Sequence, residues 1–505
     1  MTRPPRIPPW ALAAAVALAA CAGVKQTTTS GSGGDPSPGT GGGTSTGGAR
    51  ATGGRGATPG TGGSSNTGPC SSNLECAQTT CMIGTCSEPA CGELEGMKTT
   101  LSGTIYDPAG KVPLYNVSVY VPNRTLDPVP EGLSCDQCNG RASGQPIASA
   151  LTDAAGHFTM DNPPVGKNIP LVIQIGKWRR QVTIPEIVRC TDNVINDVNL
   201  QRLPRNQSEG HLPLIALTTG HSDALECLLR KIGISDSEFT NDAGSGRVHL
   251  FTGGGDLTNT SASGAGANSL ASGAKFSSAS VLWGSRTKLA TYDLMMLSCE
   301  GSQYASSKDP YLANVQWFAD NGGRIFDDHL HFYWLQHGLP PWPATAQWVG
   351  VQPDLGDVTA QVDTTFPKGQ SLADWLVNVG ASTAKGQLPL VMAQHSVTAD
   401  SPPVSQRWIY TTAPSQSVQY LTFNTPVAAP VAAQCGRVVF TDIHVSAASG
   451  DSSHPETPFP GGCTSTTMSP QEKALEFIFF DLSSCVQNDF DPPVGIKIGY
   501  AGARP

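Results

Sequence analysis

The segment 292–335 constrains the fold of this chain more than any other part of the sequence. Its first residues, 292–297, form an unbroken apolar run with the length of a strand that is buried on both faces of a parallel sheet. Asp309 before Pro310 predicts an N-cap and the start of a helix, and Gly322-Gly323 predicts the end of that helix. The next strand is expected at 324–328. A strand, a helix and a strand in this order predict an α/β domain with a parallel sheet.

Further elements of the same domain are predicted on both sides of this segment. Short apolar runs indicate strands, and apolar residues at helical spacing indicate helices. The Gly/Ser/Ala-rich stretch 261–280 predicts a long mobile loop beside the second strand. The expected strands are 212–217, 248–251, 388–392, 407–411, 418–423 and 437–440, and the expected helices are 223–231, 371–379 and 470–482.

Most of the chemically useful side chains follow directly after predicted strands. Ligands of an open parallel sheet bind beyond the carboxyl ends of its strands, because the loops diverge there and helix N-termini point toward the crevice. We therefore expect one polar crevice that gathers these residues. Its members are His221, Gly253, Gly254, Cys299, Glu300, His329, His331, Asp442 and His444.

Two chemistries are open at this crevice. Cys299 is the candidate nucleophile, with His329 as the base and Glu300 as the orienting carboxylate; the alternative is a buried cysteine or a disulfide partner of Cys227. The spacing of His329 and His331 places both imidazoles on one side of an extended chain and predicts a metal site. Zinc is the candidate ion, Asp328, Asp442 or His444 would complete the ligands, and the alternative is a pair of histidines that pack at a sheet edge.

The letters LSCEG and FADNGGRIFDDHLH resemble the trehalose-utilisation-protein-like branch of the class I glutamine amidotransferase fold. The resemblance spans 210–490 and implies a flavodoxin-like parallel sheet. The family's nucleophile elbow is Gly-x-Cys-x-Gly, but here Leu297 replaces its first glycine while Gly301 matches the second. This departure implies a degenerate site that binds a ligand without efficient catalysis. The stretch 454–456, His-Pro-Glu, copies the family's His-x-Glu letters but lies beyond the last strand, so we do not assign it that role.

The N-terminus has the pattern of an exported lipoprotein. Arg3 and Arg6 precede an apolar run, and small residues then lead to Cys21. This pattern predicts a signal peptide at 1–21, lipidation of Cys21, and a location in the outer membrane or on the cell surface of a Gram-negative bacterium. The Gly/Ser/Thr-rich stretch 22–69 predicts a disordered tether.

The 14 cysteines of an exported chain predict disulfides. Five of them lie in 70–95, a segment too short for a hydrophobic core, which predicts a small disulfide-rich module. For Cys135 and Cys138 we expect a structural bridge, with Cys190 as a partner. Cys435 and Cys485 are expected to pair, with Cys463 as a competitor.

Alternating apolar residues at 101–106 and 116–121, together with turns that begin at Asp107 and Asp153, predict an all-β sandwich at 97–203. Its pattern resembles the carboxypeptidase regulatory-like (transthyretin-like) domain, which carries no catalytic residues and would be a spacer or a binding module. The stretch 178–180, Trp-Arg-Arg, is expected to be exposed as a contact surface. The matching positions are Gly103, Asp107, Gly110, Pro113, Leu114, Val117, Val119, Thr152, Asp153, Gly156, Phe158, Pro164 and Gly166.

The charge balance excludes one class of partner. Removal of the signal peptide would leave 29 basic and 40 acidic residues, a net charge of −11, so we expect no nucleic acid as a partner. The expected function is that of a membrane-anchored envelope protein that binds a ligand, a carbohydrate or another envelope protein. The alternative is an extracytoplasmic hydrolase that uses a histidine-bound metal or the Cys299 thiol.

Overall fold

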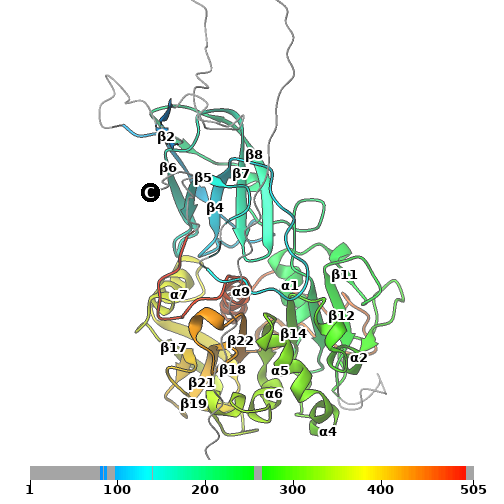
Figure 1. Cartoon of the computed structure of the whole chain (residues 1–505). Helices are drawn as coiled ribbons and strands as arrows, with labels where there is room; N and C mark the ends of the chain where they lie inside the picture. The colour runs from blue at the N-terminus through cyan, green and yellow to red at the C-terminus, as the bar shows by residue number, and fades with distance from the viewer. Residues whose placement is uncertain are drawn as a thin grey trace, which may run out of the picture. The chain divides into compact units, whose positions relative to one another are not determined.

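The computed structural model describes residues 80–82, 85–87, 97–138, 140, 142–254 and 264–495, which belong to one compact unit of the chain (Figure 1). The predicted signal peptide, Cys21 and the tether lie outside the described residues. Of the cysteine-rich module, the structure describes one antiparallel hairpin, β1 (Thr80–Met82) and β2 (Thr85–Ser87), in which Cys81 lies opposite Cys86. Among the described residues, no helix has both the length and the hydropathy that a bilayer crossing requires.

Residues 97–203 form a β-sandwich-like part with two small sheets. The strand orders are β6-β3-β9 and β5-β4-β7-β8. Buried residues of both sheets, among them Leu101, Phe158 and Ile173, share one apolar core. Trp178 begins β8 and is fully buried, so its predicted exposure is wrong. The bounds are β3 (Thr100–Thr104), β4 (Ser118–Pro122), β5 (Pro146–Leu151), β6 (His157–Asp161), β7 (Gly166–Ile175), β8 (Trp178–Ile187) and β9 (Asp192–Val194).

The remainder of the described chain is organised around an 11-stranded sheet with the order β11-β12-β10-β14-β15-β22-β21-β20-β17-β18, while β13 pairs with β12. The strands from β11 to β22 in this order run parallel, and β21, β20, β17 and β18 continue the sheet antiparallel. The bounds are β10 (Ile215–Thr219), β11 (Phe239–Thr240), β12 (Val248–Thr252), β13 (Ser277–Ser278), β14 (Leu294–Leu297), β15 (Arg324–Asp328), β17 (Gly356–Val362), β18 (Gln387–Ala393), β20 (Gln406–Thr411), β21 (Ser417–Thr425) and β22 (Gly436–Thr441).

Both faces of the parallel strands are buried. Leu294 and Met296 of β14 join one core with α1 and α9, whereas Met295 and Leu297 join a second core with α2 and α5. This explains why the strands are apolar without alternation. The helices are α1 (Leu225–Ile232), α2 (Ala279–Trp283), α3 (Arg286–Leu289), α4 (Ala305–Lys308), α5 (Leu312–Asp320), α6 (Tyr333–Gln336), α7 (Pro367–Asn378), α8 (Ser446–Ser449) and α9 (Pro470–Ser483), and a small separate sheet pairs β16 (Ala346–Trp348) with β19 (Val397–Asp400).

The segment 292–335 has the predicted order of elements with one correction. Gly322 adopts φ +105 just after α5, as expected of a helix stop. Asp309 is not an N-cap, because α4 begins before it and Asp309 itself lies in the 3₁₀ turn η4 (Asp309–Tyr311). Its carboxylate instead accepts a hydrogen bond of 2.5 Å from the hydroxyl of Tyr333. The predicted loop 261–280 is described from residue 264 and ends in β13 and the start of α2.

The disulfides differ from the predicted pairs. Cys135 bonds Cys435 and Cys138 bonds Cys485, so the insertion of the β-sandwich is linked twice to the α/β part. Cys227 bonds Cys463. Cys435 and Cys485 therefore do not pair with each other, and neither Cys135 nor Cys138 bonds Cys190, which is itself disulfide-bonded. Pairs separated by 236 to 347 residues leave no local signal in the sequence.

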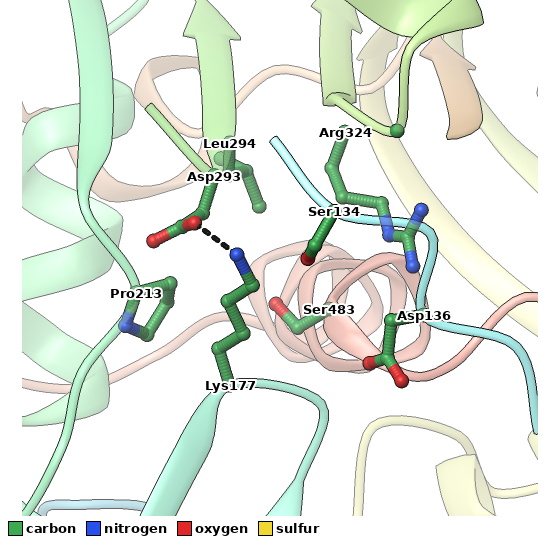
Figure 2. Close-up of a pocket in the computed structure, with 9 residues that line it drawn as sticks. Ser134, Asp136, Lys177, Pro213, Asp293, Leu294, Arg324 and Ser483 are labelled. Carbon is green, nitrogen blue, oxygen red and sulfur yellow. Dashed lines mark hydrogen bonds and ion pairs between the residues drawn. The ribbon is translucent and has the colours of Figure 1, made fainter. Parts of the chain in front are cut away.

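The β-sandwich contacts the amino ends of the parallel strands. Lys177, in the β7–β8 turn, forms an ion pair with Asp293, which directly precedes β14 (Figure 2). Arg324, the first residue of β15, lines the same small cavity of about 30 Å³ and donates to the carbonyl of Cys435. This volume holds one or two waters. The carboxyl ends of the strands thus lie at the edge opposite this contact.

Candidate metal centre

The loops after β10 and β14 meet at the carboxyl edge of the sheet. β10 lies between β12 and β14, so the chain crosses to opposite sides at this point, which is where open α/β sheets bind their ligands. Gly220 follows β10, and a Cβ at this position would lie 2.2 Å from the carbonyl oxygen of Cys299. Ser222 donates its backbone N–H to the same oxygen at 3.0 Å. Only glycine at position 220 permits this close approach of the two loops.

Three side chains gather at this edge. The Sγ of Cys299 is 3.4 Å from the Nδ1 of His329, and the rings of His329 and His444 have centroids 5.0 Å apart. One donor atom from each of the three residues lies within 4.8 Å of the other two. All three are buried, with Cys299 at 0% exposure. They follow β14, β15 and β22, which are adjacent in the sheet.

His331 does not belong to this cluster. His329 adopts φ +42 and begins the 3₁₀ turn η5 (His329–Phe332), so the chain is not extended there and the two imidazoles diverge. The Nε2 of His331 donates to the carbonyl of Ser298 at 2.9 Å, and its Nδ1 accepts from Trp334 at 3.0 Å. Both ring nitrogens are occupied, which leaves no lone pair for a metal.

Burial keeps the three groups neutral. It raises the pKa of the Cys299 thiol well above its usual range, and the neighbouring Asp328 carboxylate adds to this effect. It lowers the pKa of His329 well below the usual value, with a further contribution from His444, and it also lowers the pKa of His444. The site therefore holds a thiol and two neutral imidazoles. Neutral imidazoles present the lone pairs that a metal requires.

Two aspartates hold this arrangement together: Asp328, which the sequence predicted as a candidate metal ligand, and Asp223, which was not in the predicted set. Asp328 accepts the backbone N–H of Cys299 at 3.0 Å, and its other oxygen lies 3.8 Å from Nε2 of His444. Asp223 accepts the N–H groups of Val445 and Ser446, which fixes the loop that carries His444. The position of Asp223 between the predicted strand 212–217 and the predicted helix 223–231 was the available signal.

Glu300 points away from the thiol. It pairs with the buried Lys308 at 2.9 Å and accepts the N–H of Gly254 at 3.0 Å. A Cβ at Gly253 would lie 2.6 Å from its Oε1, so the two glycines make room for this carboxylate. These contacts give Glu300 and Gly253-Gly254 a structural role at the edge of the site.

Asp442 is occupied elsewhere. Its Oδ2 accepts the backbone N–H of Ser396 at 2.8 Å, and burial raises its pKa to about 7. His221 is exposed and contacts His454, the histidine of the His-Pro-Glu stretch 454–456, with 2.9 Å between their Nδ1 atoms. The predicted crevice thus divides into a buried Cys299–His329–His444 cluster, a Glu300–Lys308 pair and an exposed histidine pair.

The backbone at Cys299 is not that of a nucleophile elbow. Positive φ angles occur at Gly301 (+79) and Tyr304 (+45), but not at Cys299. The strained turn that would present a reactive thiol to substrate is absent at this residue, in agreement with Leu297 in place of the elbow's first glycine. The strained residue next to the thiol is His329, and strain of this kind in a non-glycine residue often marks a functional site.

The distance between sulfur and nitrogen suits a tetrahedral ion. With bonds of about 2.3 Å to sulfur and about 2.0 Å to nitrogen, a separation of 3.4 Å corresponds to an angle of about 100° at the metal. One thiolate and two imidazoles are a donor set for Zn²⁺ or Cu⁺, and they leave a fourth position open.

Comparisons with known proteins give no family. No protein-family model matches the chain, and no curated protein matches it. Two solved structures were found, a C-terminal and an N-terminal interface mutant of a type II cohesin–X–dockerin complex from Acetivibrio cellulolyticus. Each is 14% identical with a TM-score of 0.14, and they cover 28% and 29% of this chain and 75% and 80% of the matched chains. Scores at this level carry no argument about fold or function.

Proposed function

We propose that this chain is an extracytoplasmic metal-binding protein that holds Zn²⁺ through Cys299, His329 and His444. The single observation that supports the proposal most is the buried cluster of one sulfur and two nitrogen donors within 4.8 Å of one another. The three donors come from the ends of three adjacent strands, so the scaffold brings them close together before any ion binds, and their widest separation, up to 4.8 Å, would shorten by side-chain rotation when the ion binds. A rigid scaffold of this kind favours a specific ion over an adaptable surface site.

The partners of the cluster support the same proposal. Asp328 bonds the backbone of Cys299 and lies near His444, which is the position of an outer-shell carboxylate in many metal sites. Metal binding would release the proton of the Cys299 thiol and leave a buried negative sulfur. The positive charge of the ion would balance this negative charge. The open fourth position would take water or a small ligand.

The fold and location remain proposals that accompany this function. The parallel strands follow the order β12-β10-β14-β15-β22, which corresponds to the 2-1-3-4-5 order of flavodoxin-like sheets. This order supports the proposed kinship with the class I glutamine amidotransferase fold. The three disulfides that join pairs of described residues support an extracytoplasmic location, and the lipoprotein pattern at Cys21 supports an envelope anchor. In this arrangement the β-sandwich acts as a spacer. We predict that the ligand at the open metal position is a carbohydrate or another small polar molecule.

A second candidate function is a thiol hydrolase. The contact between Cys299 and His329 at 3.4 Å is the geometry of a nucleophile and its base, and this favours the idea. The raised pKa of the thiol and the absence of an elbow at Cys299 weigh against it.

One experiment separates the two functions. Untagged protein is stripped of metal, loaded with Co²⁺ as a spectroscopic substitute for Zn²⁺, and compared with the variants Cys299→Ser and His444→Gln. We expect one equivalent of Co²⁺ with tetrahedral d–d bands and sulfur-to-metal charge transfer in the wild type. Both variants should lose the charge-transfer band or the ion, while His331→Gln and the exposed His157→Gln retain both. Wild-type protein that binds no Co²⁺ or Zn²⁺ would contradict the proposal and leave the thiol hydrolase as the remaining candidate.

A further inference from the structure

His221 and His454 form a second histidine site that the buried cluster does not include. Their Nδ1 atoms are 2.9 Å apart, and their ring centroids are 4.4 Å apart. His221 is exposed and His454 is half-buried, so solvent reaches the pair. Two lone pairs at this distance repel each other, and the contact therefore requires either a proton or a cation between the two nitrogens.

The backbone on both sides of the pair is fixed. His221 donates its N–H to the carbonyl of Gly264 at 3.1 Å, and Gly220 and Ser222 on either side of it contact the carbonyl of Cys299. These contacts hold the loop after β10 in place. His221 therefore needs no backbone movement to present its ring.

The loop that carries His454 is held just as firmly. Ser453 donates to the buried Glu226 and accepts the N–H of Ala267 at 2.9 Å. Asp451 pairs with Lys231 of α1, and Cys463 is disulfide-bonded to Cys227 of the same helix. Both histidines are thus anchored to the segment around α1, so the pair is preorganised rather than a chance contact between two mobile loops.

The distance between the two nitrogens selects the ion. With metal–nitrogen bonds of about 2.0 Å, a separation of 2.9 Å corresponds to an angle of about 90°. Tetrahedral Zn²⁺ would hold two nitrogens about 3.3 Å apart. An angle near 90° belongs to tetragonal ions, Cu²⁺ and Ni²⁺, and Cu²⁺ binds nitrogen ligands more strongly.

We propose that His221 and His454 form a surface site for Cu²⁺, separate from the buried Cys299–His329–His444 cluster, with water in the remaining positions. The two sites differ in donor set, angle and access to solvent. The proposal does not depend on the buried site, because neither histidine is shared with it.

The test uses untagged full-length protein in a Cys299→Ser background, in which the buried thiol can neither bind nor reduce Cu²⁺. Cu²⁺ is titrated and followed by equilibrium dialysis and electron paramagnetic resonance. We expect one equivalent with an axial spectrum and nitrogen hyperfine structure. His221→Gln and His454→Gln should each weaken binding at least about tenfold, while His157→Gln, an exposed histidine of β6, leaves it unchanged.

A second measurement avoids substitutions at the site. Bound Cu²⁺ should protect His221 and His454 of the parent protein from diethyl pyrocarbonate, as mapped by mass spectrometry, while His157 reacts at the same rate with and without the ion. Equal Cu²⁺ affinity in the parent and both variants would overturn the proposal. So would modification of the two histidines at the same rate with and without Cu²⁺. The contact between His221 and His454 would then be a hydrogen bond only.

Discussion

The thiol of Cys299 lies 3.4 Å from an imidazole nitrogen of His329, yet the two groups form a neutral pair and not a thiolate–imidazolium pair. Burial disfavours both charged forms, and Asp328 opposes a negative sulfur still further. A transition metal changes this balance, because it supplies the positive charge that the buried thiolate lacks.

The first prediction concerns the reactivity of this thiol. Cys299 is the free cysteine of the described residues and is completely buried, so iodoacetamide should alkylate it at least about tenfold more slowly in native protein than in protein unfolded by urea. Mass spectrometry of peptides after labelling without reductant measures this directly. Rapid labelling of Cys299 in the folded protein would instead support the nucleophile.

Much of the parallel sheet could be predicted from the sequence, because its strands are apolar on both faces. The strand Arg324–Asp328 has the predicted bounds, and the ends of β14 and β22 lie within two residues of the expected ranges. Because parallel strands all end at the same edge of a sheet, the sequence also predicts a common edge for Cys299, His329 and His444. Strand order and the antiparallel extension through β21, β20, β17 and β18 could not be derived, since pairing between distant strands leaves no local pattern.

The composition of the site was harder to predict because it depends on backbone turns. The positive φ of His329 makes its imidazole diverge from that of His331, and no neighbouring residue in the sequence predicts that turn. His454 was not assigned a role because it lies beyond the last predicted strand, whereas contacts of the neighbouring Ser453 with Glu226 and Ala267 bring it to His221. The disulfide partners of Cys135 and Cys138 lie 300 and 347 residues away, beyond the reach of spacing arguments.

The second prediction uses the strain at His329. Its φ of +42 suits glycine better than any residue with a Cβ. His329→Gly should therefore be more stable than His329→Ala by about 1 kcal/mol, although both lose metal binding. Urea unfolding of the two variants gives the difference. Equal stabilities would mean that the backbone relaxes out of the left-handed region when the imidazole is gone.

The third prediction concerns the Glu300–Lys308 pair, whose side chains are each 1% exposed. Lys308→Met would leave the Glu300 carboxylate buried with the N–H of Gly254 as a remaining partner, and this should cost about 3–5 kcal/mol of unfolding free energy. The double variant Lys308→Met/Glu300→Gln removes the uncompensated charge and should recover part of the loss.

The control for this pair is the exposed ion pair between Lys385 and Asp374, whose side chains are 57% and 45% exposed. Lys385→Met should change stability by less than about 0.5 kcal/mol, because water screens both charges. A similar loss of unfolding free energy in Lys308→Met and Lys385→Met would show that the buried Glu300–Lys308 pair is no more important for stability than an exposed pair.

The fourth prediction is a pH dependence of stability from Asp107 of the β-sandwich and Glu476 of α9. Burial raises the pKa of Asp107 to about 7, and burial together with the neighbouring Asp107 raises the pKa of Glu476 well above its usual value. Both carboxyls are therefore protonated in the folded protein at mildly acidic pH, while the unfolded chain ionises them near pH 4. The folded state binds more protons, so the stability from Asp107 is complete below about pH 4 and is lost as the pH rises to about 7, by about 4 kcal/mol at most.

Asp107→Asn should reduce this pH dependence, because the amide cannot ionise while its oxygen still accepts the N–H of Lys111. In urea unfolding, the variant should gain stability relative to wild type between pH 5 and pH 8. Asp153→Asn is the matched control, since Asp153 occupies the corresponding turn at an exposed position, where its oxygen accepts the N–H groups of Ala155 and His157. Its difference from wild type should be the same at both pH values. If the stability difference between Asp107→Asn and wild type is the same at pH 5 and pH 8, as expected for Asp153→Asn, the Asp107–Glu476 pair does not cause a pH-dependent loss of stability. Asp107 would then be ionised in the folded protein across this pH range.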